Sequence, residues 1–217
     1  MYHAGLWSDT LTYDLLQRVP KKWGLSILEF QYERVARPSE WRAPTWSWAS
    51  VKSAVEYEDL AGFESKLTSC EVEIEHAGES ETGQLESATL EVSGLLVEVT
   101  VHQPQTNDER QRHRTAYLEF GDLVIHFEED YDIWGDPSSP IEEEGALFYL
   151  LVGEWLKDES SENGYDKLWY MVLNQVDSEN DLYERVGVAT IPIEEGKFET
   201  YKDFLCSLRQ TENVCIL

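Results

Sequence analysis

The chain has 217 residues, of which 43 are acidic and 17 are basic, so its formal net charge is −26 at pH 7. A surface of that charge repels phosphate backbones and anionic lipids, which argues against nucleic acid and membrane as partners. Hydrophobic residues make up 41% of the sequence, enough for a core, yet no run reaches the roughly 18 apolar residues that cross a bilayer. The N-terminus lacks a secretory signal and the three cysteines lack CxxC spacing, so we expect a cytoplasmic protein with reduced thiols.

The first predicted element is a helix near the N-terminus. Ser8 or Asp9 can cap it, and apolar residues at helical spacing precede Pro20; these are Leu11, Leu15 and Leu16. From residue 25 onward the pattern alternates with a period of two, which is typical of β-strands. The expected strands cover residues 25–35, 46–51, 54–60, 66–77, 89–103, 115–121, 122–129, 146–155, 167–176 and 182–191.

Clusters of Gly, Asn, Asp, Ser and Pro separate these strands, which favours antiparallel pairing over parallel βαβ units. A second amphipathic helix is expected from residue 196, followed by a closing strand in NVCIL at the C-terminal end. We therefore predict a mainly β fold, an antiparallel barrel or sandwich of about 9–11 strands with an N-terminal and a C-terminal helix. It forms one domain over residues 1–217, divided into a helical segment 1–24, antiparallel strands 25–195, and a helix with closing strand 196–217.

The stretch RAPTWSWASV, residues 42–51, holds two tryptophans one residue apart. In a strand, Trp46 and Trp48 lie on one face, where two indoles cover a large apolar area. Two interpretations stay open at this point. The pair forms the thickest part of the core, or one indole lines an apolar cavity.

Two stretches in order carry a resemblance to a known family: MYHAGLWSDTLTYDLL at residues 1–16 and RAPTWSWASV. Together they resemble the C-terminal region of fungal heterokaryon incompatibility (HET-domain) proteins, where "YLAGLW…DL…LLW" precedes "APSWSWASVDG". LYERVGVA, residues 182–189, gives a weaker similarity to a closing "ERVG" strand of that family. The strongly matching positions are Ala4, Gly5, Leu6, Trp7, Asp9, Leu15, Leu16, Arg42, Ala43, Pro44, Trp46, Ser47, Trp48, Ala49, Ser50 and Val51.

The resemblance covers about the first quarter of the chain, and two departures from the family pattern stand out. Lys52 and Ser53 replace the acidic residue and glycine that follow the tryptophans in the family. Because the first matching stretch lies at residues 1–16, we also expect this chain to lack the N-terminal HET effector region of the family. In the family that region is linked to a cell-death response, so the resemblance implies that this chain does not trigger the response alone.

The sequence has no GxSxG, HExxH, Gly-rich phosphate loop or GKS/GKT motif. We therefore expect no cofactor and no metal site. His126 and Glu128 share a strand face, but an ordinary solvated strand explains that spacing better than a pair of metal ligands. His126 remains a candidate general acid or base, and AVEYEDL could present Tyr57 and Asp59 together for the same work. The candidate ligand-binding aromatics are Trp7, Trp46, Trp48, Trp169 and Tyr170.

Two functions from different classes follow. In the first, the domain holds an apolar small molecule in an aromatic-lined cavity and promotes its cyclisation, cycloaddition or isomerisation without a cofactor, in fungal specialised metabolism. In the second, it is a non-catalytic recognition or regulatory module of the non-self recognition system, whose acidic surface steers a basic protein partner. The missing effector region, the abundant aromatics and the changed Lys52-Ser53 pair favour the first narrowly.

Overall fold

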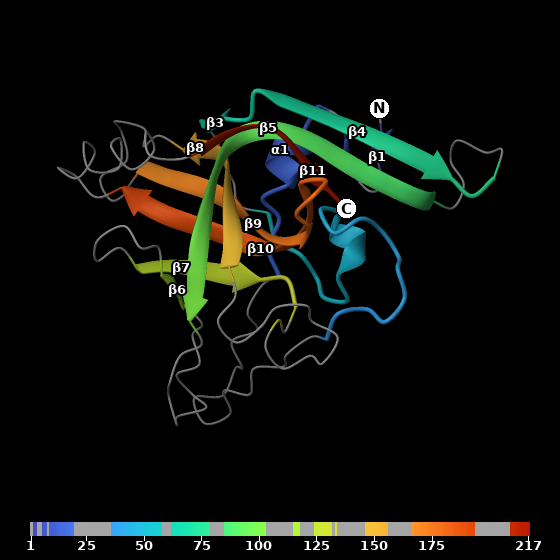
Figure 1. Ribbon diagram of the computed structural model, residues 1–217, viewed down its shortest axis with the longest axis horizontal. Coiled ribbons are helices and arrows are strands. Elements are labelled where there is room, and N and C mark those ends of the chain that lie inside the picture. Colours follow the sequence, from blue (N-terminus) through green and yellow to red (C-terminus); the bar gives the residue numbers. More distant parts are fainter. Residues whose placement is uncertain are drawn as a thin grey trace.

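The protein is described by a computed structural model, which covers residues 2–3, 6–7, 9–19, 36–57, 62–78, 85–102, 115–117, 124–131, 133, 146–155, 166–193 and 209–217. Strands dominate these residues (Figure 1). The elements in chain order are β1 (Tyr2–His3), β2 (Leu6–Trp7), α1 (Leu11–Asp14), the 3-10 turn η1 (Trp48–Ser50), β3 (Phe63–Ser65), β4 (Ser69–His76), β5 (Leu85–His102), β6 (Thr115–Tyr117), β7 (Val124–Glu129), β8 (Ala146–Trp155), β9 (Asp166–Asp177), β10 (Leu182–Ile193) and β11 (Arg209–Ile216).

Strands β3 to β11 form one nine-stranded sheet in the order β11-β5-β6-β7-β10-β9-β8-β3, with β4 paired to β5. All its pairings are antiparallel except that of β10 with β11. The 18-residue β5 organises the sheet, because its first part pairs with β4 and β11 and its last part with β8 and β6. Since β5 meets both β6 and β8, the sheet curls into a partial ring, while β4 and the start of β5 extend beyond it (Figure 1).

Strand β5 exchanges partners near Gly94, where two leucine side chains lie close to the backbone. A Cβ atom there would lie 3.0 Å from Leu67 Cδ2 and 3.1 Å from Leu150 Cδ1, tighter than ordinary van der Waals contact. Glycine therefore lets Leu67 and Leu150 pack against the strand at this position.

The sheet is covered on both faces. One core cluster holds Val99, Phe127, Tyr131, Ile133, Leu147, Tyr149, Leu151, Leu168, Tyr170, Val172, Val186, Ala189, Ile191 and Ile193. The other includes the leucines of and after α1 and Trp46, with Trp169, Met171 and Leu173 from β9. Residues 168–173 of β9 alternate between the two clusters, which explains why this strand is an almost unbroken apolar run.

The mainly β, mostly antiparallel class predicted from the sequence is confirmed, and so are the strands expected at residues 66–77, 89–103, 146–155, 167–176 and 182–191. The predicted barrel is wrong. Strands β5 and β6 meet over only three residue pairs, so the ring closes there by a short contact and not by a full strand.

The predicted N-terminal helix is much shorter than expected. Helix α1 has four residues, and two segments before it are the short strands β1 and β2. It is the only α-helix among the described residues. The predicted strand at 25–35 and the predicted helix over residues 196–208 lie outside those residues, whereas NVCIL closes the sheet as the end of β11. No helix in the described part of the chain is long and apolar enough to span a membrane.

Candidate functional site at the motif junction

The segment at residues 36–57 carries the tryptophan motif, and its backbone turns instead of forming a strand. Ser47 Oγ accepts a hydrogen bond from Ala49 N at 3.2 Å, and Ser50 Oγ donates to Ser47 O at 2.7 Å. These local bonds compete with a sheet ladder and stabilise η1. The expected strand at 46–51 is therefore wrong, and so is the shared face of its two tryptophans.

The two tryptophans have opposite environments. Trp46 is fully buried in the same core cluster as Leu11, Leu15 and Leu16, whereas Trp48 is 42% exposed. The backbone of Trp46 is also held, since Gln17 Nε2 donates to its carbonyl at 3.4 Å. The core interpretation is thus the one that fits Trp46, and Trp48 faces solvent.

Arg185 on β10 is the most heavily engaged polar side chain in this region. It is 1% exposed, and its Nε and Nη2 atoms bind the two oxygens of Asp130 at 2.7 and 3.1 Å. Its Nη1 donates to Leu15 O at 2.7 Å, and its Nη2 also donates to Gln17 O. Arginine thereby satisfies carbonyls just after α1, which an isolated helix end leaves without partners.

Thr45 joins the tryptophan segment to Arg185. Its hydroxyl accepts a hydrogen bond from Arg185 N at 2.9 Å and donates to Leu217 O. Its backbone N–H also donates to Leu217 O, at 2.7 Å. We call Leu15, Gln17, Thr45, Asp130 and Arg185 the motif junction.

Residues from three stretches singled out in the sequence meet at the motif junction. Leu15 belongs to the first stretch, Thr45 lies within the second, and Arg185 belongs to ERVG. The Arg185 guanidinium donates to Leu15 O, and the backbone N–H of Arg185 donates to the Thr45 hydroxyl, so one residue links segments more than 100 residues apart in sequence. Through these bonds Arg185 fixes the tryptophan segment next to the end of α1.

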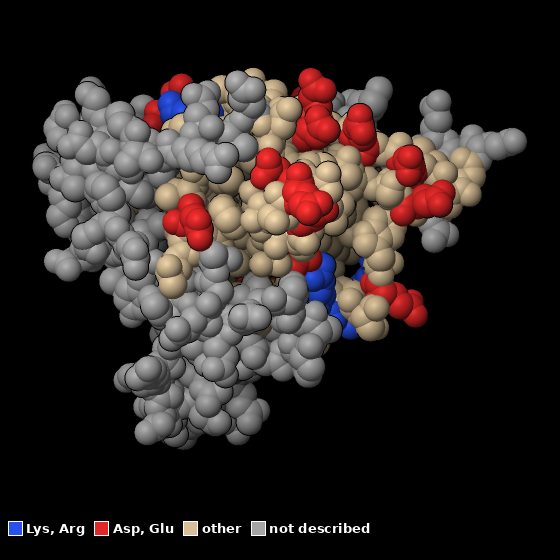
Figure 2. All heavy atoms as spheres, viewed as in Figure 1, with Lys and Arg blue, Asp and Glu red and all other residues tan. Residues whose placement is uncertain are grey.

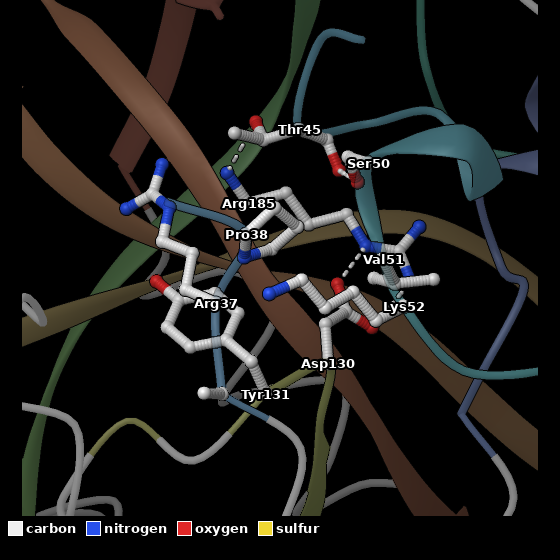
Figure 3. A pocket seen from close by; sticks show the side chains of 10 residues that line it. Arg37, Pro38, Thr45, Ser50, Val51, Lys52, Asp130, Tyr131 and Arg185 are labelled. Carbon is white, nitrogen blue, oxygen red and sulfur yellow. Dashed lines mark hydrogen bonds and ion pairs between the residues drawn. The ribbon is translucent and has the colours of Figure 1, made fainter. Parts of the chain in front are cut away.

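A small pocket opens beside the motif junction (Figure 3). Its cavity volume is about 20 Å³, room for about one water molecule. The wall contains cations, an acid, hydroxyls and apolar groups: Ala36, Arg37, Pro38, Thr45, Ser50, Val51, Lys52, Asp130, Tyr131 and Arg185.

A second ion pair borders this pocket. Arg37 Nη2 lies 2.6 Å from Glu184 Oε2, and the Arg37 guanidinium lies 5.3 Å from the centre of the Tyr131 ring. Asn174 Nδ2 donates to the other Glu184 oxygen at 3.3 Å. Arginine bound both to a carboxylate and to an aromatic face is well fixed in orientation.

The catalytic residues predicted from the sequence are not brought together by the described geometry. Tyr57 is 43% exposed and its hydroxyl donates to Gln17 Oε1 at 3.3 Å, next to the motif junction. The first four residues of the strand expected at 54–60 form no strand, since Glu56 makes only an isolated bridge with Arg18, and residues 58–60 lie outside the described residues. Asp59 lies outside the described residues, and His126 lies in β7, where the structure describes its backbone alone.

The predicted ligand-binding aromatics are spread over separate places. Trp46 and Trp169 belong to one core cluster and Tyr170 to the other, because neighbours on β9 point to opposite faces. Trp48 is exposed, and Trp7 is described only as backbone in β2. Among the residues that the structure describes, they do not line one common cavity.

Tyr149 is a buried polar group that no sequence motif marks. Its ring lies 5.8 Å from that of Tyr170, and its hydroxyl has no hydrogen-bond partner in the described part of the chain. Burial, followed by the neighbouring Tyr170, raises the pKa of Tyr149, so this phenol stays neutral.

The Asp130–Arg185 pair was also missed at the level of sequence. Asp130 lies in the acidic run HFEEDYD, which is typical of a solvated loop or strand face, and Arg185 lies in a strand pattern. Nothing in the spacing of these two residues marks them as a pair in the sequence.

Comparison of the chain with known protein families, curated proteins and solved structures gave no match. Within the described residues, no three His, Cys, Asp or Glu side chains are grouped so that they could hold a metal ion.

Proposed function

We propose that the chain is a non-catalytic protein-recognition or regulatory domain, similar to the C-terminal region of HET-domain proteins, that contacts its partner through residues 36–57. One observation carries the proposal. This segment holds Trp41 and Trp48 in solvent, 53% and 42% exposed, while Trp46 and Thr45 fix its other side to the sheet.

Exposed tryptophans on a fixed backbone suit protein binding. Tryptophan is enriched among the residues that dominate interface energies. An aromatic side chain that is already positioned loses little conformational freedom on binding, so more of its contact energy appears as affinity. Binding residues are also commonly found on loops that a rigid scaffold positions, which is the arrangement at residues 36–57.

The charge of this segment supports the same function. Residues 36–57 contain Arg37, Arg42 and Lys52 against Glu40, Glu56 and no aspartate, whereas the chain as a whole carries 43 acidic and 17 basic residues. Arginine and tryptophan are enriched in protein interfaces, and acidic residues are depleted there. The acidic surface elsewhere then acts at longer range, steering a partner with basic regions.

The test measures binding to purified HET effector regions from HET-domain proteins of the same organism by isothermal titration calorimetry. Trp41→Ala and Trp48→Ala should each weaken binding by about tenfold or more, as expected for interface anchors. Val176→Ala is the matched control, since Val176 is 42% exposed but lies on β9. Wild-type protein that binds none of these regions would contradict the proposal.

A small-molecule enzyme is the second candidate, and the buried Tyr149 favours it. A neutral phenol in an apolar core is a hydrogen-bond donor of the kind that polarises a carbonyl in cofactor-independent cyclisation or isomerisation. Tyr170, a predicted ligand-binding residue, lies beside it. Saturable quenching of tryptophan fluorescence by a fraction of a fungal extract, weakened by Tyr149→Phe in folded protein, would favour this function. No response to any fraction would count against it.

A further inference from the structure

We propose that the pocket beside the motif junction binds a carboxylate group carried by the partner, with Lys52 as its principal contact. The inference rests on the proposed recognition function and adds the chemistry of the docking group. The three cations that line the pocket differ in how many partners they already have.

Two of the three cations in the pocket wall already have carboxylate partners. Arg185 is bound to Asp130 through two nitrogens, and Arg37 is bound to Glu184. Lys52 makes no hydrogen bond or ion pair with any residue that the structure describes, and its side chain lies among the pocket residues (Figure 3). It is therefore the cation with capacity for an incoming anion.

The local balance of charge favours an anion despite the net charge of −26. Arg37, Lys52 and Arg185 stand against Asp130 and Glu184, which leaves one positive charge at the pocket. Exposed charges farther away than about 8 Å are largely screened at physiological ionic strength. Both oxygens of Asp130 are engaged by Arg185, so this acid is compensated and repels an incoming carboxylate little.

The size and walls of the pocket indicate which anion fits. The cavity volume of about 20 Å³ has room for about one water-sized group, so it can take one oxygen of a carboxylate but not a whole tetrahedral phosphate. Pro38 and Val51 give the pocket apolar walls, and the exposed Trp48 precedes Lys52 closely in the chain. An aspartate or glutamate flanked by apolar residues in a protein segment would match both features.

The first experiment uses sodium acetate as the probe and follows backbone amide signals of the full chain by ¹H–¹⁵N NMR, with sodium chloride at equal ionic strength as reference. Acetate should cause saturable shifts of Ser50, Lys52 and Tyr131 that chloride does not cause. Lys52→Gln should weaken acetate binding by about fivefold or more, as loss of a charged hydrogen bond implies. Lys66→Gln is the control, because Lys66 already binds Glu64 and Glu154 at 3.2 and 2.7 Å.

Shifts that are the same with acetate and chloride, or unchanged acetate affinity in folded Lys52→Gln protein, would overturn the inference. The effector-binding assay separates this failure from that of the proposed function. If Trp48→Ala weakens effector binding and Lys52→Gln does not, the recognition function is supported and the carboxylate site is contradicted. Wild-type protein that binds no effector region while still binding acetate would retain the site and remove the function.

Discussion

The motif junction and the outer strand β4 place charge in opposite environments. At the junction, Arg185 is 1% exposed and bound to Asp130 and to backbone carbonyls. On β4, Glu71, Glu73 and Glu75 lie exposed, and Glu71 is directly opposite Glu91 of β5. Acidic side chains are spread over the described part of the face that Figure 2 shows.

This difference indicates what each kind of charge contributes. Exposed charges are solvated and screened, so each of them adds little to the stability of the fold. Together they affect solubility and the rate of association with a partner. A buried charge must be fully compensated, so it holds its partners in fixed positions. One arginine at the junction therefore does more to position segments than the many glutamates on the surface.

The largest effect is expected from Arg185→Met. The substitution leaves Asp130 buried without its cation and removes the donors to Leu15 O and Gln17 O. Breaking a buried pair from one side destabilises by about 3–5 kcal/mol, which urea unfolding followed by fluorescence can measure. The control Lys66→Met removes a more exposed pair and should cost about 1 kcal/mol or less.

The double variant Arg185→Met with Asp130→Leu tests the cause of that loss. Because it removes both charges, it should recover part of the lost unfolding free energy. If the single variant were no less stable than the Lys66→Met control, the contrast between the junction and the acidic surface would be broken.

An effect of similar size is expected at one of the two tryptophans. Trp46→Ala should lower the unfolding free energy by about 3–5 kcal/mol, because it empties a fully buried site. Trp48→Ala should cost about 1 kcal/mol or less, since its side chain is 42% exposed. Equal losses in the two variants would restore the view that both indoles lie on one buried face.

The strands of the central sheet could be predicted because their signal is local. Strand β8 covers the predicted residues 146–155, and β9 and β10 differ from their predictions by at most two residues at an end. Alternation over ten or more residues leaves few alternatives to a strand. The same alternation in WSWASV covers only six residues, and its serines offered local hydrogen bonds that favour a turn.

The candidate site was less predictable because its parts are distant in sequence. Asp130 and Arg185 are 55 residues apart, and Leu15 and Arg185 are 170 apart. No local spacing distinguishes Asp130 from the other acids of its run, since what sets it apart is the partner that the fold brings to it. The exposure of Trp48 is equally hard to predict from the sequence, because it depends on how the distant residue Gln17 and the core hold Trp46.

A smaller effect is expected on β4. Glu71→Lys replaces a like-charge pair across the strands with an opposite-charge pair, because the new ammonium group would stand directly opposite Glu91. Such cross-strand pairs contribute about 0.2–1 kcal/mol, so the variant should be slightly more stable. The gain in unfolding free energy should shrink in about 0.5 M NaCl, because both side chains are exposed. A gain that does not depend on salt would show that its cause is not electrostatic.

The smallest effect concerns Tyr57, which lies between the two kinds of environment. Burial raises the pKa of Tyr57 above its ordinary value of 10.0, Asp14 raises it further, and Arg185 opposes the shift. The folded state therefore holds the phenol proton more tightly than the unfolded state does. The contribution of the protonated phenol to the unfolding free energy is complete below about pH 10 and is lost as the pH rises through the higher pKa of the folded state. Tyr57→Phe lacks this titration, so the unfolding free energy of the wild type should fall relative to the variant above about pH 10, while the remaining tyrosines contribute equally to both. If the difference in unfolding free energy between the two proteins stays constant from about pH 7 to pH 11, Tyr57 titrates alike in the folded and unfolded states. Its hydrogen bond to Gln17 would then be its only link to the junction.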